Sequence, residues 1–85
     1  MSSQANRPDA PIAWTGNLND DCKALWAGLT LHAEQMDRNL WWWAVTVERT
    51  GETVADSHGS EEAVRSGKEA RVAAEAAARN WLQSA

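Results

Sequence analysis

The sequence predicts an α+β fold, a small antiparallel sheet of three to four strands in a meander with one long C-terminal α-helix packed on one face. Three consecutive tryptophans at positions 41–43 predict a strand, because no helical stripe uses three adjacent positions, whereas a strand would place Trp41, Trp43, Val45 and Val47 on one face and Trp42 on the other. The stretch 61–83 is rich in alanine and contains no proline, which is typical of a helix. A chain of 85 residues is long enough for one such domain.

Composition and charge limit the classes of function. Hydrophobic residues make up 44% of the chain and charged residues 24%, as in soluble globular proteins. The single cysteine, Cys22, excludes an internal disulfide and a thiolate metal cluster. With no signal peptide and no long apolar run, the chain is expected to be cytoplasmic and not to enter a membrane. The formal net charge of −4 disfavours nucleic acid, because it repels phosphates at long range.

The N-terminal residues differ in composition from the rest of the chain. Residues 1–11 hold both prolines and almost nothing that could be buried. We therefore expect a flexible leader over 1–11 and a single α+β domain over 12–85. The polar or glycine-containing stretches 15–17 and 19–21 predict two turns at the start of that domain.

Residues 25–34 admit two interpretations. As a strand they alternate throughout, with one face carrying Leu25, Ala27, Leu29, Leu31 and Ala33 and the other carrying Trp26, Gly28, Thr30, His32 and Glu34. As part of a helix over 22–36, an N-cap at Asn19 or Asp20 is available, but Leu31 lies outside the apolar stripe. Gly28 would also cost about 1 kcal/mol in the middle of that helix. The period favours the strand, and the helix remains the alternative.

Turn signals define two further strands. Residues 35–39 are polar enough to reverse the chain, which would pair 25–34 with a strand over 40–48. A turn over 49–52 contains a glycine that can adopt positive φ, and it leads to a short strand over 53–57. The three strands would form an antiparallel meander.

The predicted helix begins after Ser60, a suitable N-cap, and Glu61 and Glu62 place negative charge at the positive end of its dipole. The inner face of this helix consists almost entirely of small residues, and Val64, Ala78 and Leu82 flank it. The residues of the inner face are Ala63, Gly67, Ala70, Ala74, Ala77 and Trp81. Small residues allow close approach to a sheet whose inward residues are bulky. Trp41 and Trp43 are expected to supply that bulk.

Catalytic chemistry finds little support in the sequence. His32, His58 and Cys22 have no nucleophile, base or carboxylate partner at a recognisable spacing. The adjacent acids at 20–21 and 61–62 are explained by capping and solubility, and they do not resemble a cation-binding loop. We therefore expect a non-enzymatic protein with no cofactor and no metal.

The sheet face opposite the helix is the candidate binding surface. Trp42 cannot share a face with Trp41 and Trp43, and one helix cannot cover both faces of a sheet. The N-terminal segment with Ile12 and Trp14 could fold over this face, a second copy could cover it as a homodimer, or another protein could bind there. We expect a protein-interaction module, an adaptor or inhibitor of bacterial or phage type, with these partner-binding residues: Trp26, Thr30, His32, Trp42, Ala44 and Thr46.

The run Ser66-Gly67-Lys68-Glu69-Ala70-Arg71-Val72-Ala73-Ala74, which follows three predicted antiparallel strands, resembles the C-terminal part of a double-stranded RNA-binding domain. The resemblance covers about the last forty residues of the chain and implies nucleic-acid binding as an alternative function. That family has a lysine cluster at the helix N-terminus and a further helix before the sheet. Here Glu61 and Glu62 follow the predicted cap, and the N-terminal half is predicted to be strand.

Overall fold

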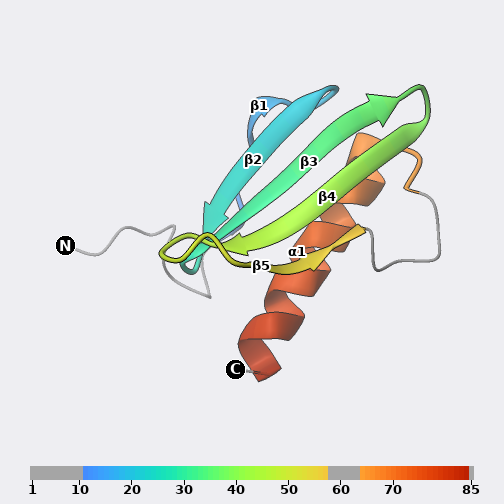
Figure 1. Ribbon diagram of the computed structural model, residues 1–85. Coiled ribbons are helices and arrows are strands. Elements are labelled where there is room, and N and C mark those ends of the chain that lie inside the picture. The colour runs from blue at the N-terminus through green and yellow to red at the C-terminus, as the bar shows by residue number, and fades with distance from the viewer. Residues whose placement is uncertain (1–10, 58–63, 85) are drawn as a thin grey trace.

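The computed structural model describes residues 11–57 and 64–84, and in these ranges it shows five strands followed by one helix (Figure 1). The strands pair antiparallel with their neighbours in sequence, so their order in the sheet equals their order in the chain. The elements are β1 (Thr15–Asn17), β2 (Asp21–Trp26), β3 (Leu29–Asp37), β4 (Leu40–Val47), β5 (Thr53–Asp56) and α1 (Gly67–Ser84). The predicted α+β meander with a C-terminal helix is confirmed, with five strands in place of three to four.

A tight turn divides the segment that the sequence predicted as one strand over 25–34. Ala27 and Gly28 have φ values of 52° and 79°, and Trp26 pairs directly with Leu29 across this turn. Two consecutive residues with positive φ are the signature of a type I′ hairpin turn. The predicted continuous strand is therefore wrong, as is the helical alternative, because these residues belong to two strands of a hairpin.

The first strand was missed by the sequence prediction. Residues 15–17, predicted as a turn, form β1 and pair with β2 through Gly16↔Cys22 and its neighbours. Gly16 has φ of 95°, and a Cβ there would lie 2.8 Å from the carbonyl oxygen of Asp21. The chain reverses after β1, where Asp20 N–H donates to the Asn17 carbonyl at 3.0 Å. A strand so short and polar carries no hydrophobic alternation.

The hairpins that follow agree with the sequence prediction. β3 and β4 are antiparallel neighbours, joined by a turn in which Asn39 has φ of 58°. β4 continues into a turn at Gly51, with φ of 77°, and β5 then returns beside β4. The predicted strands over 40–48 and 53–57 are confirmed within a residue of their bounds.

The helix begins later than predicted. The proposed N-cap Ser60 lies outside the described residues, and Val64 forms an isolated antiparallel β-bridge with Trp41, whose N–H donates to the Val64 carbonyl at 2.8 Å. The observed N-cap is Ser66, whose Oγ accepts from Glu69 N–H at 3.1 Å. Glu69 Oε2 in turn accepts from Arg65 N–H at 3.0 Å, so the arrangement resembles a capping box. The predicted helix start at Glu61 is therefore wrong, and α1 begins at Gly67.

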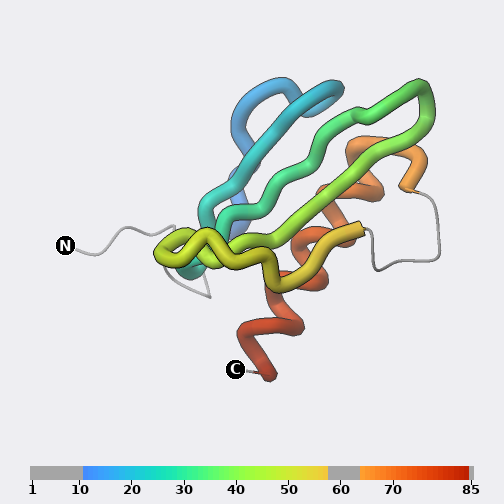
Figure 2. The backbone as a smooth tube through the Cα atoms, viewed as in Figure 1, coloured from blue at the N-terminus to red at the C-terminus, as the bar shows by residue number. Residues whose placement is uncertain are grey.

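The core lies between α1 and one face of the sheet. Figure 2 shows the backbone of the helix running across the strands. Trp41 and Trp43 are buried, as predicted, and they meet a helix face of small buried residues: Gly67, Ala70, Ala74 and Ala78. Ala77 and Trp81, predicted on this face, are half-buried at its margin. Within 11–57 and 64–84, no helix has both the length and the apolar composition that a membrane span requires.

Candidate functional site: the open face of the sheet

The sheet face away from α1 carries side chains in three rows that follow the strand register; we call it the open face. The first row is Asp21, Glu34 and Trp42. The second row is Lys23, His32, Ala44 and Asp56. The third row is Leu25, Thr30, Thr46 and Thr53. Strand residues alternate between faces, so these positions share one side, while their neighbours Cys22, Ala24 and Trp26 enter the core.

Five of the six predicted partner-binding residues lie together on this face. Thr30 and His32 come from β3, and they pair across the ladder with Thr46 and Ala44 of β4. Trp42 occupies the first row and is half-buried. Ala44 is only 3% exposed, because its short side chain lies in the second row between the larger side chains of His32 and Asp56.

Trp26 is the exception, and its predicted place on the open face is wrong. It faces α1 and is 2% exposed, with the Arg79 guanidinium 5.5 Å from the centre of its ring. The turn at Ala27 and Gly28 reverses the chain, so Trp26 and Leu29 share a face instead of alternating. Leu25 takes the open-face position and is 51% exposed. The signal that could have revealed this was a glycine between two apolar runs, which marks a short hairpin turn.

The N-terminal segment does not cover the open face over its described residues. Ile12 and Trp14 pack against the core cluster, and Trp14 Nε1–H donates to Glu75 Oε2 of α1 at 2.9 Å. This bond places Trp14 on the helix side of the sheet. The interpretation in which Ile12 and Trp14 shield Trp42 is therefore wrong.

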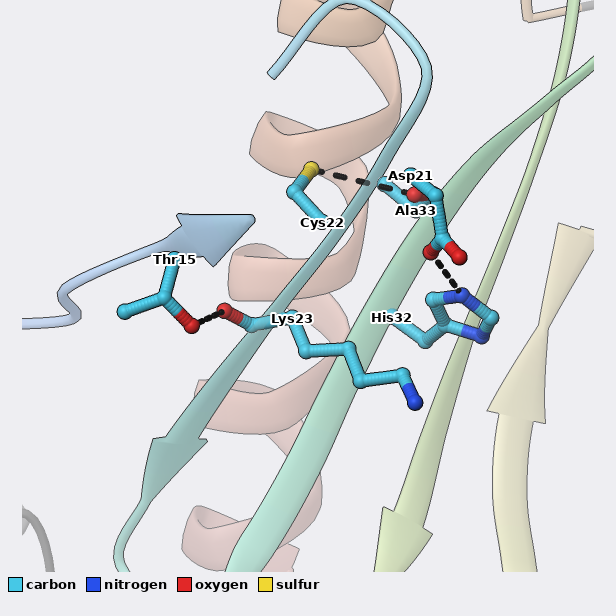
Figure 3. Close-up of polar contacts among 6 residues, drawn as sticks. All are labelled: Thr15, Asp21, Cys22, Lys23, His32 and Ala33. Carbon is cyan, nitrogen blue, oxygen red and sulfur yellow. Dashed lines mark hydrogen bonds and ion pairs between the residues drawn. The ribbon is translucent and has the colours of Figure 1, made fainter. Parts of the chain in front are cut away.

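His32 is held in place by two neighbours on the open face. Its Nε2 lies 2.6 Å from Asp21 Oδ1, a contact drawn in Figure 3 that runs diagonally between the first and second rows. Its ring meets the Trp42 indole edge to face, with centroids 5.3 Å apart and planes at 86°. Asp21, His32 and Trp42 therefore form a connected series from β2 to β4 that restricts the Trp42 ring.

Cys22 and His32 lie on opposite faces of the sheet. Cys22 is buried beneath α1, and its Sγ–H donates to the Ala33 carbonyl at 3.7 Å (Figure 3). A Cys–His nucleophile pair requires the two side chains to meet, so these two cannot form one. His58 lies outside the described residues. In the described ranges, no three acidic, histidine or cysteine side chains are grouped to hold a metal ion.

The charges on the open face are unequal. Its three rows carry three carboxylates, Asp21, Glu34 and Asp56, and one ammonium group, that of Lys23. Lys23 lies on β2, which pairs with β1, and Thr15 Oγ1–H of β1 donates to the Lys23 carbonyl at 3.3 Å (Figure 3). The surface around Trp42 is therefore acidic, while the third row with Leu25 is uncharged.

The chain matches no protein-family model, no curated protein and no solved structure.

Proposed function

We propose that the protein is a small non-enzymatic interaction module, an adaptor or inhibitor, that binds another protein or a second copy of itself through the open face. The observation that carries the proposal is the position of Trp42. It lies on the face opposite α1, away from the other described tryptophans, and the segment with Ile12 and Trp14 packs elsewhere.

The composition of the open face suits a protein interface. Trp42 in the first row and Leu25 in the third row provide apolar contact area, and Thr30 and Thr46 extend the row of Leu25 on a rigid ladder. Lys23 and the carboxylates supply polar groups in the first two rows. Protein interfaces combine an apolar centre with a polar rim, and tryptophan is enriched among the residues that dominate binding free energy. A surface already ordered by the sheet also loses little conformational entropy on binding.

Nucleic-acid binding, the alternative implied by the resemblance to double-stranded RNA-binding domains, receives less support. In the described part of the chain, five strands and no helix precede α1, where that family requires a helix before its sheet. An aromatic residue on a sheet can stack on a base, but Glu34 and Asp21 share the row of Trp42 and would repel phosphates.

Trp42→Ala tests the proposal. We expect association, with a second copy or with a captured partner, to weaken by at least about 2 kcal/mol while the isolated fold is kept. Analytical ultracentrifugation at several concentrations measures self-association, and cross-linking in extracts of the source cells measures partner capture. Val72→Ala, on the exposed side of α1, is the control and should change neither measurement. A Trp42→Ala protein that loses stability but keeps its oligomeric state and its partners would contradict the proposal.

A further inference from the structure

We infer that the occupant of the open face is a basic, partly apolar segment of another protein and not a second copy of this chain. The inference rests on the proposed function, and it names the chemistry of the partner at the same site.

The charge balance of the face argues against self-association. With His32 neutral, three carboxylates and one ammonium group give the three rows a charge of −2. A two-fold dimer uses the same surface on both subunits, so it would bring a charge of −4 into one interface. Burying these carboxylates in an interface would cost desolvation free energy, and their mutual repulsion would also oppose association. A partner with positive side chains has the complementary charge.

Two of the carboxylates lie in the same row as the half-buried Trp42 ring. Glu34 is the cross-strand neighbour of Trp42, and Asp21 is the next residue in the same row. No hydrogen bond or ion pair of the Glu34 side chain is found within the described parts of the chain. The Asp21 side chain is half exposed even while it contacts His32. An arginine or lysine over this row would meet carboxylate oxygens and an indole face together.

The rows also give the binding surface a direction. Positive charge is favoured at the first row, which contains Glu34 and Trp42, whereas the third row offers Leu25, Thr30 and Thr46. Leu25 is half exposed and has no charged neighbour within its row. A matching segment therefore carries an arginine or lysine at one end and an aliphatic or aromatic residue at the other.

A random peptide library displayed on phage tests this inference. Selection on the full chain at low salt is expected to enrich arginine and lysine next to apolar residues. A selected peptide, synthesised with a fluorescent label, is then titrated by anisotropy. Glu34→Gln should weaken its binding about twofold to fivefold, the range of an exposed ion pair. Trp42→Ala should weaken it about thirtyfold.

Glu52→Gln is the matched control, because it removes the same charge from an exposed residue in the turn between β4 and β5, outside the three rows. Its effect should be smaller than that of Glu34→Gln, and high salt should reduce the difference between the two variants. Circular dichroism of each variant separates lost binding from lost folding.

The outcomes separate this inference from the proposed function. Selected peptides that are neutral or acidic, yet depend on Trp42, would overturn the basic partner and keep the interaction module. A wild-type dimer that Trp42→Ala dissociates would do the same, because the occupant would be a second copy. A monomer that selects no peptide, or selects only peptides indifferent to Trp42→Ala, would overturn both.

Discussion

Gly67, the first residue of α1, lies directly against the indole of Trp41. A Cβ built on Gly67 would come within 2.8 Å of Cη2 of Trp41 and within 2.8 Å of the Leu18 carbonyl oxygen. The helix start, β4 and the turn after β1 therefore meet at one point. Arg71 strengthens this junction, because its Nη1–H donates to the same Leu18 carbonyl at 2.9 Å.

Gly67→Ala is expected to destabilise the protein by about 1 to 3 kcal/mol, the usual cost of overpacking a core. Alanine ordinarily favours a helix over glycine, so intrinsic propensity alone predicts a change of the opposite sign. Urea denaturation measures the difference. Lys68→Ala, one residue further along and exposed, is the control and should change the free energy of unfolding by less than about 0.5 kcal/mol. A Gly67→Ala protein more stable than wild type would show that the helix start can move off Trp41.

Trp26 and Leu25 should respond to substitution in the order opposite to the sequence prediction. Trp26→Ala removes a side chain that is 2% exposed and should lower the free energy of unfolding by about 3 to 5 kcal/mol. Leu25→Ala, on the open face, should change it by no more than about 0.5 kcal/mol. Thermal melts of the two variants decide the matter. Equal effects would mean that the turn between β2 and β3 is not placed at Ala27 and Gly28.

The buried stripe of α1 should be sensitive to side-chain size. Ala74 has no exposed surface, so Ala74→Leu should force the helix away from the sheet and destabilise by about 1 to 3 kcal/mol. Val72 is 58% exposed, and Val72→Ala should be nearly silent. Chemical denaturation of both proteins makes the comparison, and the reverse order would require a helix rotated about its axis.

The turn between β2 and β3 provides a test of backbone conformation. Ala27 has positive φ, which asparagine tolerates better, so Ala27→Asn should raise the free energy of unfolding by about 0.5 to 1 kcal/mol. Gly28→Ala should lower it by about 1 kcal/mol, although no atom lies within 4 Å of the added Cβ. Differential scanning calorimetry measures both shifts. A neutral Gly28→Ala would indicate that this turn changes its conformation readily.

Long periodic elements were predictable from the sequence because their pattern repeats over many residues. In the run from Trp41 to Val47, strand geometry places successive side chains on alternate faces of the sheet. The row of small residues on α1 fits against a sheet face with large side chains. The start of α1 was placed too early because both Ser60 and Ser66 satisfy the chemistry of an N-cap. Ser66 also has Glu69 three residues later, whose N–H donates to Ser66 Oγ and whose carboxylate accepts from Arg65 N–H, and this arrangement distinguishes it from Ser60.

The site was predicted in part, and its error has one geometric cause. Inserting a two-residue turn into an alternating sequence changes the face of every residue before the turn relative to those after it. Thr30, His32, Trp42, Ala44 and Thr46 come after the turn at Ala27 and Gly28, and the structure brings them together. Trp26 comes before it, and its face was therefore assigned wrongly. The acidic first row could not be found without the register between β2, β3 and β4.

The sequential strand order determines when each part of the fold can form. Every ladder joins neighbours in the chain, so the sheet can assemble from contacts of low sequence separation while the chain is still emerging from the ribosome. The element that covers the core follows all five described strands. Until α1 docks, Trp26, Trp41 and Trp43 are left in water beside Leu29 and Val45. We expect this nascent sheet to be the aggregation-prone species during synthesis, and rapid docking of the alanine face to be what protects it.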